Sequence, residues 1–311
     1  MARIGLIDVD SHNFPNLALM KISAYHKALG DEVVWYDRLF GGHYDKVYAS
    51  KVFSFTEDID YYIDADEVIK GGSGYCIDVK NGKECWNDDN NHSLPYEIEH
   101  IYPDYSLYPE LTKDTAYGFL TRGCPRGCDF CIVGKKEGKI SRKVADLSEF
   151  WRGQKNIVLC DPNILACKDW EDLLNQLIAS GACIDFNQGL DIRLMTERKA
   201  EMISKLKIKE IHFAWDRYKD GAVILPKLKM FAEICKTKPH SHNSIVYTLV
   251  NFDTTIEQDL ERIYTLRDMG YWPYIMIYQK STCARVYKDL ARWVNNKFIF
   301  ASCKRFEDYK R

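Results

Sequence analysis

The sequence has no long apolar run and no strong excess of charge of either sign. No stretch approaches the roughly 18 consecutive apolar residues that a membrane-spanning helix requires, so we expect a protein that acts without a membrane. The formal net charge of −2 argues against bulk electrostatic capture of nucleic acid and leaves only a local basic face for such contacts. The first residues read as a strand and lack the apolar core of a signal peptide, which predicts a cytoplasmic location.

Cysteine, in contrast, is abundant. The 311 residues include 11 cysteines, an odd number, and eight of them are scattered along the chain. Without an export signal, this usage favours reduced thiols in a cytoplasm over a disulfide framework. The length allows two domains, and 46% apolar with 28% charged residues is typical of a globular protein.

Three thiols are grouped in one short motif, C-x3-C-x2-C, formed by Cys124, Cys128 and Cys131. Pro125 and Gly127 make this segment a turn, so one loop presents all three sulfurs. Tetrahedral zinc would require a fourth Cys or His, and none follows at finger or ribbon spacing. Three thiolates suit an iron–sulfur cluster with one iron left open for an outside ligand. The alternative is three ordinary cysteines in an apolar loop.

The motif, with Phe130 directly before its last cysteine, resembles the signature of the radical SAM superfamily. The resemblance implies that Cys124, Cys128 and Cys131 ligate a [4Fe–4S] cluster and that Phe130 lies near the adenine of S-adenosylmethionine. It implies an enzyme that reductively cleaves this cosubstrate to a 5′-deoxyadenosyl radical, with a reductant such as flavodoxin or ferredoxin as partner. Residues 115–120 ahead of the motif read as the first strand of a barrel, where the family has its cluster loop.

The N-terminal region reads as the start of an open parallel sheet. Apolar strands are expected at 3–9, 32–36, 46–49 and 68–69, with a helix from Leu17 that ends at Gly30. Strand, helix and strand joined by short turns predict a small Rossmann-like domain over residues 1–75.

This domain is similar to the cobalamin-binding module that precedes the barrel in one branch of the superfamily. Asp10, His12 and Pro15 match its D-x-H-x-x-G loop except that proline replaces glycine, and Ser50 with Gly71-Gly72 loosely echoes its later motifs. Because of these departures we expect a module without the corrinoid, with bound cobalamin as the alternative.

The rest of the chain is expected to form a linker, a barrel and a short extension. Residues 76–112 are irregular and polar, with one hairpin turning at Asn81-Gly82. Six strand–helix repeats over residues 113–282 predict a partial (β/α)6 barrel, and residues 283–311 are expected to form a C-terminal helical extension. Further strands are expected at 156–160, 183–187, 210–215, 244–251, 274–278 and 298–301, and helices at 170–178, 196–207, 226–236, 255–270 and 286–295.

Candidate site residues follow these strands, because a parallel barrel builds its site at the carboxyl ends of its strands. After the second strand, Asp161 and Asn163 are candidates for the S-adenosylmethionine ammonium. After the third, Gln188, Asp191 and Arg193 are candidates for the ribose hydroxyls and the carboxylate. The alternative for Asp191 and Arg193 is a mutual salt bridge that steadies the loop.

Three residues on later strand ends are candidate catalytic groups: Asp216, Tyr278 and Lys280. A basic run at 135–143 either contacts phosphates or forms a solvated face. We expect modification or rearrangement of a substrate, with a nucleoside or nucleic-acid base favoured because the barrel and its extension are compact. Two alternatives are a cobalamin-dependent radical SAM methyltransferase and, from another class, a non-catalytic iron–sulfur sensor or electron carrier.

Overall fold

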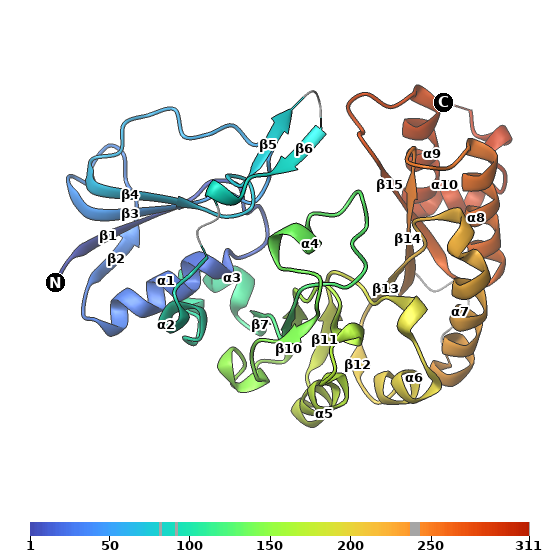
Figure 1. Cartoon of the computed structure of the whole chain (residues 1–311), viewed down its shortest axis with the longest axis horizontal. Coiled ribbons are helices and arrows are strands. Elements are labelled where there is room, and N and C mark those ends of the chain that lie inside the picture. The colour runs from blue at the N-terminus through green and yellow to red at the C-terminus, as the bar shows by residue number, and fades with distance from the viewer. Residues whose placement is uncertain (81–82, 91–92, 237–242, 311) are drawn as a thin grey trace. The chain divides into compact units, whose positions relative to one another are not determined.

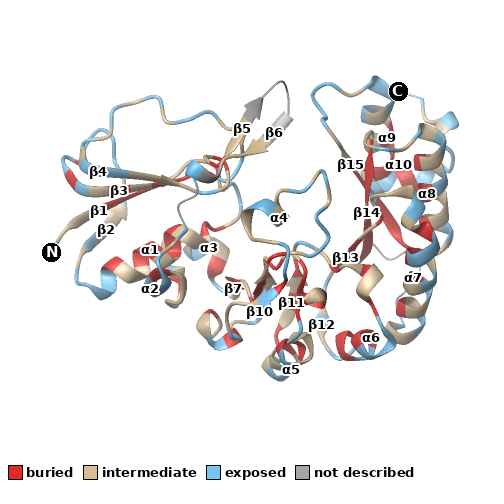
Figure 2. Cartoon of the chain, in the orientation of Figure 1, coloured by how far each residue is buried: buried red, intermediate tan, exposed pale blue. Residues whose placement is uncertain are grey.

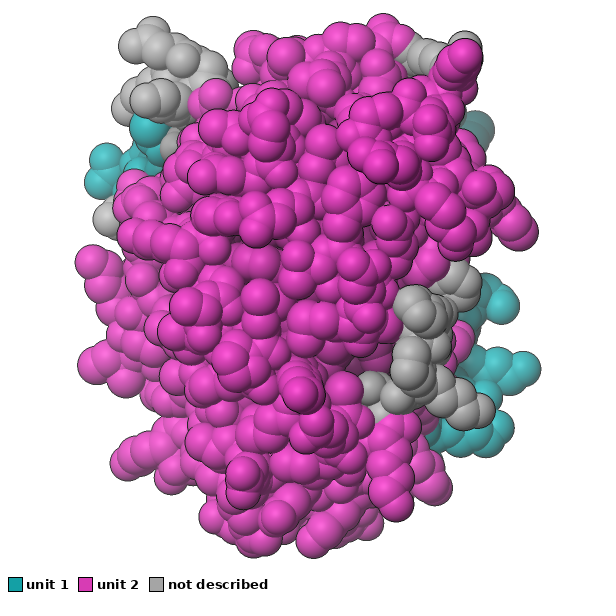
Figure 3. Space-filling model, turned by 90° about the vertical axis from the view of Figure 1, so that its right-hand side faces the viewer, with its two compact units in different colours: residues 1–118, 147–155 teal, residues 119–146, 156–311 magenta. Residues whose placement is uncertain are grey.

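The computed structural model describes the chain except residues 81–82, 91–92, 237–242 and 311 (Figure 1). The chain forms two compact units, coloured separately in Figure 3. Unit 1 comprises residues 1–118 and 147–155, and unit 2 comprises residues 119–146 and 156–311.

Unit 1 is built on a four-stranded sheet in the order β2-β1-β3-β4, with every pair parallel (Figure 1). Its strands are β1 (Arg3–Asp8), β2 (Glu32–Trp35), β3 (Tyr44–Ser50) and β4 (Ala65–Gly71). The sheet is Rossmann-like, as predicted, and each strand was placed correctly to within a few residues.

Helix α1 (Leu17–Ala28) connects β1 to β2 and packs on this sheet. Asn16 begins it, because its side chain accepts a hydrogen bond from the Leu19 amide and satisfies a donor that has no partner within the helix. Leu19 and Ile22 of the helix join Ile4 and Leu6 of β1 in a buried cluster. This apolar contact fixes the helix against the sheet.

The remaining elements of unit 1 are short. Strands β5 (Ile77–Lys80) and β6 (Lys83–Trp86) pair antiparallel, as the hairpin prediction required, while the turn at 81–82 lies outside the described residues. After them come α2 (Tyr96–Glu99), α3 (Pro109–Thr112) and β7 (Thr115–Gly118).

Segment 147–155 completes unit 1. Phe150 is buried, and the Tyr105 hydroxyl donates to its carbonyl over 2.6 Å. A Cβ added at Gly118 would lie 2.4 Å from the Phe150 ring, so only glycine allows this close approach.

Unit 2 contains two groups of parallel strands. Strand β11 (Cys183–Phe186) pairs with β10 (Asn156–Leu159) and β12 (Lys207–Ile208). Strand β14 (Ser244–Val250) pairs with β13 (Ile211–Ala214) and β15 (Trp272–Ile277), and Figure 2 shows β14 buried along its length. A short antiparallel pair, β8 (Thr121–Arg122) with β9 (Arg142–Lys143), encloses the cysteine motif and α4 (Val133–Lys136).

Helices alternate with these strands, as predicted. They are α5 (Trp170–Ser180), α6 (Glu197–Ile203), α7 (Gly221–Cys235), α8 (Ile256–Asp268) and α9 (Arg285–Asn295). Thr196 caps α6 as expected, and Thr255 begins α8 in a reciprocal capping box with Gln258. Three predicted boundaries were wrong. Helix α6 ends at Ile203, and Lys207, its expected end, begins β12. Pro226 lies inside α7, and β15 begins at Trp272, before Pro273.

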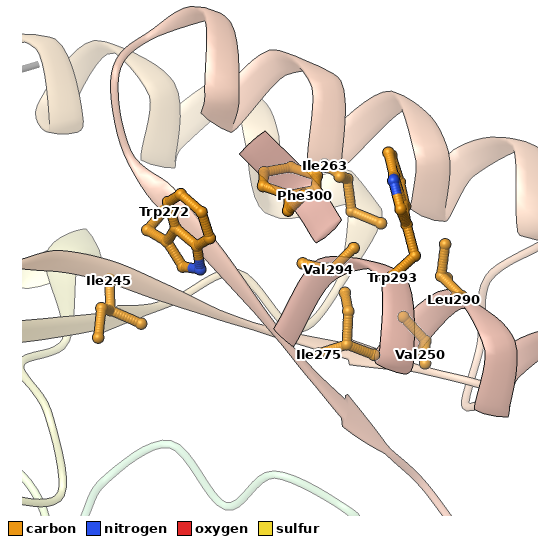
Figure 4. Close-up of a cluster of buried hydrophobic side chains, with 9 residues drawn as sticks. All are labelled: Ile245, Val250, Ile263, Trp272, Ile275, Leu290, Trp293, Val294 and Phe300. Atoms are coloured by element: carbon orange, nitrogen blue, oxygen red, sulfur yellow. The ribbon is translucent and has the colours of Figure 1, made fainter. Parts of the chain in front are cut away.

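The predicted strand at 298–301 was also wrong, since these residues form helix α10 (Lys297–Ser302). The Asn296 side chain accepts from the amides of Phe298 and Ile299 and starts the helix. Phe300 then enters the core of unit 2, where its ring lies 4.9 Å from that of Trp293 (Figure 4). Capping and burial together outweigh the strand propensity of the Phe-Ile-Phe run.

The architecture is therefore mixed α/β with parallel, Rossmann-like sheets, and closure into a partial barrel stays a prediction. Within the described ranges, no helix combines the length and apolar character that crossing a bilayer requires.

Candidate functional site

The three-cysteine motif lies on a loop of unit 2, here called the cysteine loop (residues 123–141). Gly123 has φ +88°, and a Cβ there would lie 2.2 Å from the Ile140 carbonyl oxygen. The Gly123 amide donates to the Glu137 carboxylate over 3.1 Å, and the Cys124 amide donates to the Gly138 carbonyl over 3.1 Å. These bonds close the loop at its base.

Asp161 anchors the strand that leads into this loop. Its Oδ1 accepts from the Thr121 amide over 2.5 Å and from the Thr121 hydroxyl over 2.6 Å, and its Oδ2 accepts from the Leu120 amide over 3.1 Å. Complete burial raises the pKa of Asp161 to about 6 although these hydrogen bonds favour the ionised form. The carboxylate is thus already engaged by the chain, and its predicted contact with a cofactor stays a prediction.

Asn163, two residues further on, is placed differently. Its side chain is buried, and its Nδ2 lies 3.4 Å from the Cys124 sulfur and 3.4 Å from Asp191 Oδ2. Its Oδ1 is also buried but accepts no hydrogen bond from any described residue. A buried acceptor without a donor is unfavourable, so this oxygen marks a position where an outside donor would be stabilised.

Asp191 connects the loop after β11 with the cysteine loop. Its Oδ1 accepts from Arg193 Nε over 2.8 Å, and its Oδ2 accepts from Arg126 Nε over 2.6 Å. Arg193 also donates to Asp220 over 2.9 Å. The salt bridge considered as the alternative for Asp191 and Arg193 is therefore present, whereas Gln188, predicted beside them, is exposed.

Asp216 follows β13 and contributes negative charge close to the cysteines. Burial raises its pKa to about 6, although the charges of Arg193 and Arg262 oppose the shift. Burial likewise raises the pKa of Cys128; Arg193 lowers it, while Cys131, Asp216 and Cys124 raise it further. These mutual effects place the three thiols, Asp216 and Arg193 in one electrostatic neighbourhood.

Aromatic and ionic contacts fix the far end of the cysteine loop. Phe130 packs edge-to-face on Phe252 at 5.3 Å, and Phe252 packs in the same way on Tyr278 at 4.9 Å. Arg217 donates to the Asp129 carboxylate over 2.6 Å. The loop therefore contacts residues that follow β10, β11, β13 and β14, and the last of these, Phe252, packs in turn on Tyr278 after β15.

The predicted site residues thus divide into two groups. Asn163 and Asp191 contact the cysteine loop directly. Asp161, Arg193 and Tyr278 reach it through a neighbouring residue, and Asp216 acts on it through its charge. Gln188 and Lys280 are exposed and have no such contact among the bonds described for the chain. Within the described part of the chain, no three His, Cys, Asp or Glu side chains are gathered into a group that could hold a metal ion.

Several supporting residues were missed by the sequence reasoning. Lys199 is buried and donates to the carbonyls of Leu165 and Leu194, in the loops after β10 and β11. Lys227 donates to the carbonyls of Arg193 and Met195. Both lysines lie on helices that read as ordinary amphipathic surfaces, so the sequence carried no signal of the burial of Lys199 or of the carbonyl contacts of Lys227.

Arg262 of α8 is a third supporting residue. It is fully buried beside Asp259, and its guanidinium donates to the carbonyls of Trp215, Asp216 and Leu249. It therefore links the carboxyl end of β14 to the residues that follow β13, including Asp216. A charge three residues from an acid at helical spacing was the available signal, but that pattern is usual on exposed helices.

Comparison with known proteins gives no relative, because the sequence matches no family model and no curated protein. What is established is the class of fold, an α/β chain with parallel sheets, and a loop of three cysteines held over their strand ends.

Proposed function

We propose that this protein is a radical SAM enzyme whose cysteine loop holds a [4Fe–4S] cluster through Cys124, Cys128 and Cys131. The observation that carries the proposal is the combination of three thiols on one loop with the buried Oδ1 of Asn163 beside them, which has no donor among the described residues. The chemistry of the donor set fits the group, since three thiolates would leave one iron open and Asn163 would offer an acceptor to an ammonium; binding would have to bring the three sulfurs together. If bound, the cluster would supply the one electron that reductive cleavage of S-adenosylmethionine to methionine and a 5′-deoxyadenosyl radical requires.

The chain's own residues would bind and orient the ligands. Asn163 would accept a hydrogen bond at Oδ1, and Arg193, held by Asp191 and Asp220, would contribute positive charge for a carboxylate. Phe130 would cover one side of the loop by packing on Phe252. Gln188 remains the candidate for a ribose hydroxyl.

Reaction type and substrate belong to the proposal as well. Asp216 is the favoured proton-handling residue, because a pKa of about 6 lets its carboxyl exchange a proton near neutral pH. Tyr278 and Lys280 are the further catalytic candidates, and a nucleoside or nucleic-acid base is the proposed substrate class. A flavodoxin or ferredoxin would deliver the electron, and the compartment would be the cytoplasm.

The basic run after the motif supports phosphate contact only weakly. Arg142 donates to the Glu137 carbonyl, and Lys143 pairs with Asp146 and Asp172. These groups are engaged within unit 2, as expected of a solvated face.

Anaerobic reconstitution with iron and sulfide, followed by dithionite and S-adenosylmethionine, tests the proposal. We expect about four irons per chain and formation of 5′-deoxyadenosine. Cys128→Ala should abolish both, whereas Cys183→Ala in β11, outside the loop, should abolish neither.

The alternatives give other results. Iron loading without 5′-deoxyadenosine would indicate a non-catalytic iron–sulfur protein. A corrinoid absorbance with S-adenosylhomocysteine would indicate a cobalamin-dependent methyltransferase. Zinc in the loop, or iron with four protein ligands, would overturn the proposal.

A further inference from the structure

Unit 1 contains a pocket that the proposed chemistry does not use. It has a volume of about 400 Å³ and lies at the carboxyl end of β1. In parallel sheets this edge is where ligands bind, and the volume is near the lower limit of small-molecule pockets. The pocket is lined by the residues that end β1 and begin the following turn, including Asp10 and His12 of the D-x-H motif.

The pocket is acidic. Asp8 and Asp10 both line it, and among its described lining residues there is no lysine or arginine. Asp10 is buried, and its two oxygens accept the amides of Val52 and Phe53 over 2.8 and 2.9 Å. It therefore contributes charge, but its burial keeps its oxygens from a ligand, whereas Asp8 is partly exposed.

Asp8 is the carboxylate that remains for a ligand. Its Oδ1 accepts the Ser11 amide over 3.1 Å, and its Oδ2 accepts the Tyr108 hydroxyl over 2.5 Å. Each carboxylate oxygen has two lone pairs, so each can accept one further hydrogen bond. The two existing bonds hold the carboxylate in one orientation at the pocket wall.

Aromatic rings form the other walls. Trp35 and Tyr108 meet edge-to-face at 5.4 Å, and Tyr36 stacks on Tyr61 at 6.4 Å. All four rings line the same pocket. Ring faces attract cations through their quadrupole, and Arg38 already lies over Tyr61 in this way, with its guanidinium carbon 4.6 Å from the ring centroid.

Anionic ligands are disfavoured by the same lining. A phosphate would meet two carboxylates and no lysine or arginine. Helix α1 begins nearby in sequence, but none of its residues lines the pocket, and Asn16 already accepts the Leu19 amide of its first turn. A nucleotide is therefore a poor match for this pocket although it lies on a Rossmann-like sheet.

We propose that this pocket binds a compact organic cation, with its ammonium group on Asp8 and its apolar body against the contacting rings of Trp35 and Tyr108. The site is separate from the cysteine loop, and the proposal stands whether or not that loop holds a cluster.

Three probes of one shape test it on the full chain: benzylamine, benzyl alcohol and benzoate, measured at pH 7 by calorimetry and ligand-observed NMR. We expect the dissociation constant of benzylamine to be about tenfold below that of benzyl alcohol, with benzoate undetected. Equal binding of the three probes, or preference for benzoate, would overturn the proposal.

Three variants test whether benzylamine binds in this pocket. Asp8→Asn should weaken benzylamine about tenfold and leave benzyl alcohol unchanged, while Trp35→Leu should weaken both. Asp60→Asn, which removes an exposed charge from the same unit outside the pocket, should change neither. Benzylamine binding that survives both pocket variants would place it elsewhere and refute the assignment. If Asp8→Asn does not fold, as judged by circular dichroism, the probe series on the wild type and Trp35→Leu decide.

Discussion

Asp161 and Asn163 show how much two similar residues on one strand end can differ. Both follow β10, and both were predicted to bind the same ammonium group. Asp161 accepts three hydrogen bonds from Leu120 and Thr121, whereas Asn163 has a buried oxygen with no donor among the described residues. The first residue therefore positions the cysteine loop, and the second is the better candidate for ligand contact.

The Thr121–Asp161 bond gives a stability prediction. Thr121→Val keeps the side-chain shape but removes a hydroxyl that donates over 2.6 Å to a buried carboxylate. Hydrogen bonds to charged groups contribute about 1.5–3 kcal/mol, so we expect the free energy of unfolding to fall by about 2 kcal/mol in urea denaturation. Thr248→Val is the matched control, since this equally buried hydroxyl only donates to a carbonyl at 3.4 Å. An equal loss in both variants would contradict the anchoring role.

Asp216 gives a prediction on pH dependence. Its pKa in the folded chain is raised to about 6, chiefly by burial, so the folded state holds its proton more tightly than the unfolded state. Between about pH 4 and pH 6 the unfolded chain ionises first, and stability falls as pH rises.

Asp216→Asn removes the titrating carboxyl and therefore the fall in folding stability between about pH 4 and pH 6. We expect the cluster-free variant to match the wild type near pH 4 and to be more stable by on the order of 2 kcal/mol at pH 8. Urea denaturation of both proteins across this range measures the difference. A gap that is constant with pH would show that the Asp216 pKa is not raised.

At the scale of elements, α10 shows where sequence patterns mislead. Phe298, Ile299 and Phe300 favour a strand, in which residues 298 and 300 would share one face. In the helix they diverge, so Phe298 is 87% exposed and Phe300 is 2% exposed.

Alanine substitution of Phe298 and of Phe300 distinguishes the helix from the predicted strand. Phe300→Ala should lower the free energy of unfolding by about 3–5 kcal/mol, because it empties a core position against Trp272 and Trp293. Phe298→Ala should change it by less than about 0.5 kcal/mol. Chemical denaturation measures both, and comparable losses would favour the strand.

Most elements could be predicted because their signals are local. Alternating β and α patterns located the strands of both units, and capping residues such as Thr196 and Thr255 marked helix starts. The cysteine loop was found from spacing alone. Its supporting lysines and Arg262 could not be predicted, because their burial depends on contacts far apart in the chain.

At the scale of the molecule, the chain leaves unit 1 at residue 118 and returns to it at 147–155. The expected domain boundary near residue 113 does not anticipate this return, because segment 147–155 shows no periodicity. Its contacts are specific nevertheless: His100 pairs with Glu149 over 2.8 Å, and Gln154 donates to the Tyr102 hydroxyl over 2.8 Å.

Phe150 tests whether unit 1 depends on this segment. Phe150→Ala should destabilise unit 1 by about 3–5 kcal/mol, since it removes a buried ring from the close approach at Gly118. Hydrogen exchange of the β1 and β3 amides reports on that unit. Lys155→Ala removes an exposed ion pair with Asp114. It should change the free energy of opening that hydrogen exchange measures by less than about 1 kcal/mol. Unchanged protection in both variants would show that unit 1 folds without the segment.

The return of the chain at 147–155 also sets an order of events during synthesis. The ribosome releases the three cysteines before it releases the residues that complete unit 1, and well before Arg217 and Phe252, which fix the loop. At about 5–20 residues per second, the thiols are without these partners for on the order of ten seconds. During that interval the nascent chain presents the three thiols without the contacts that later fix the loop, so the length of their exposure depends on the rate of translation.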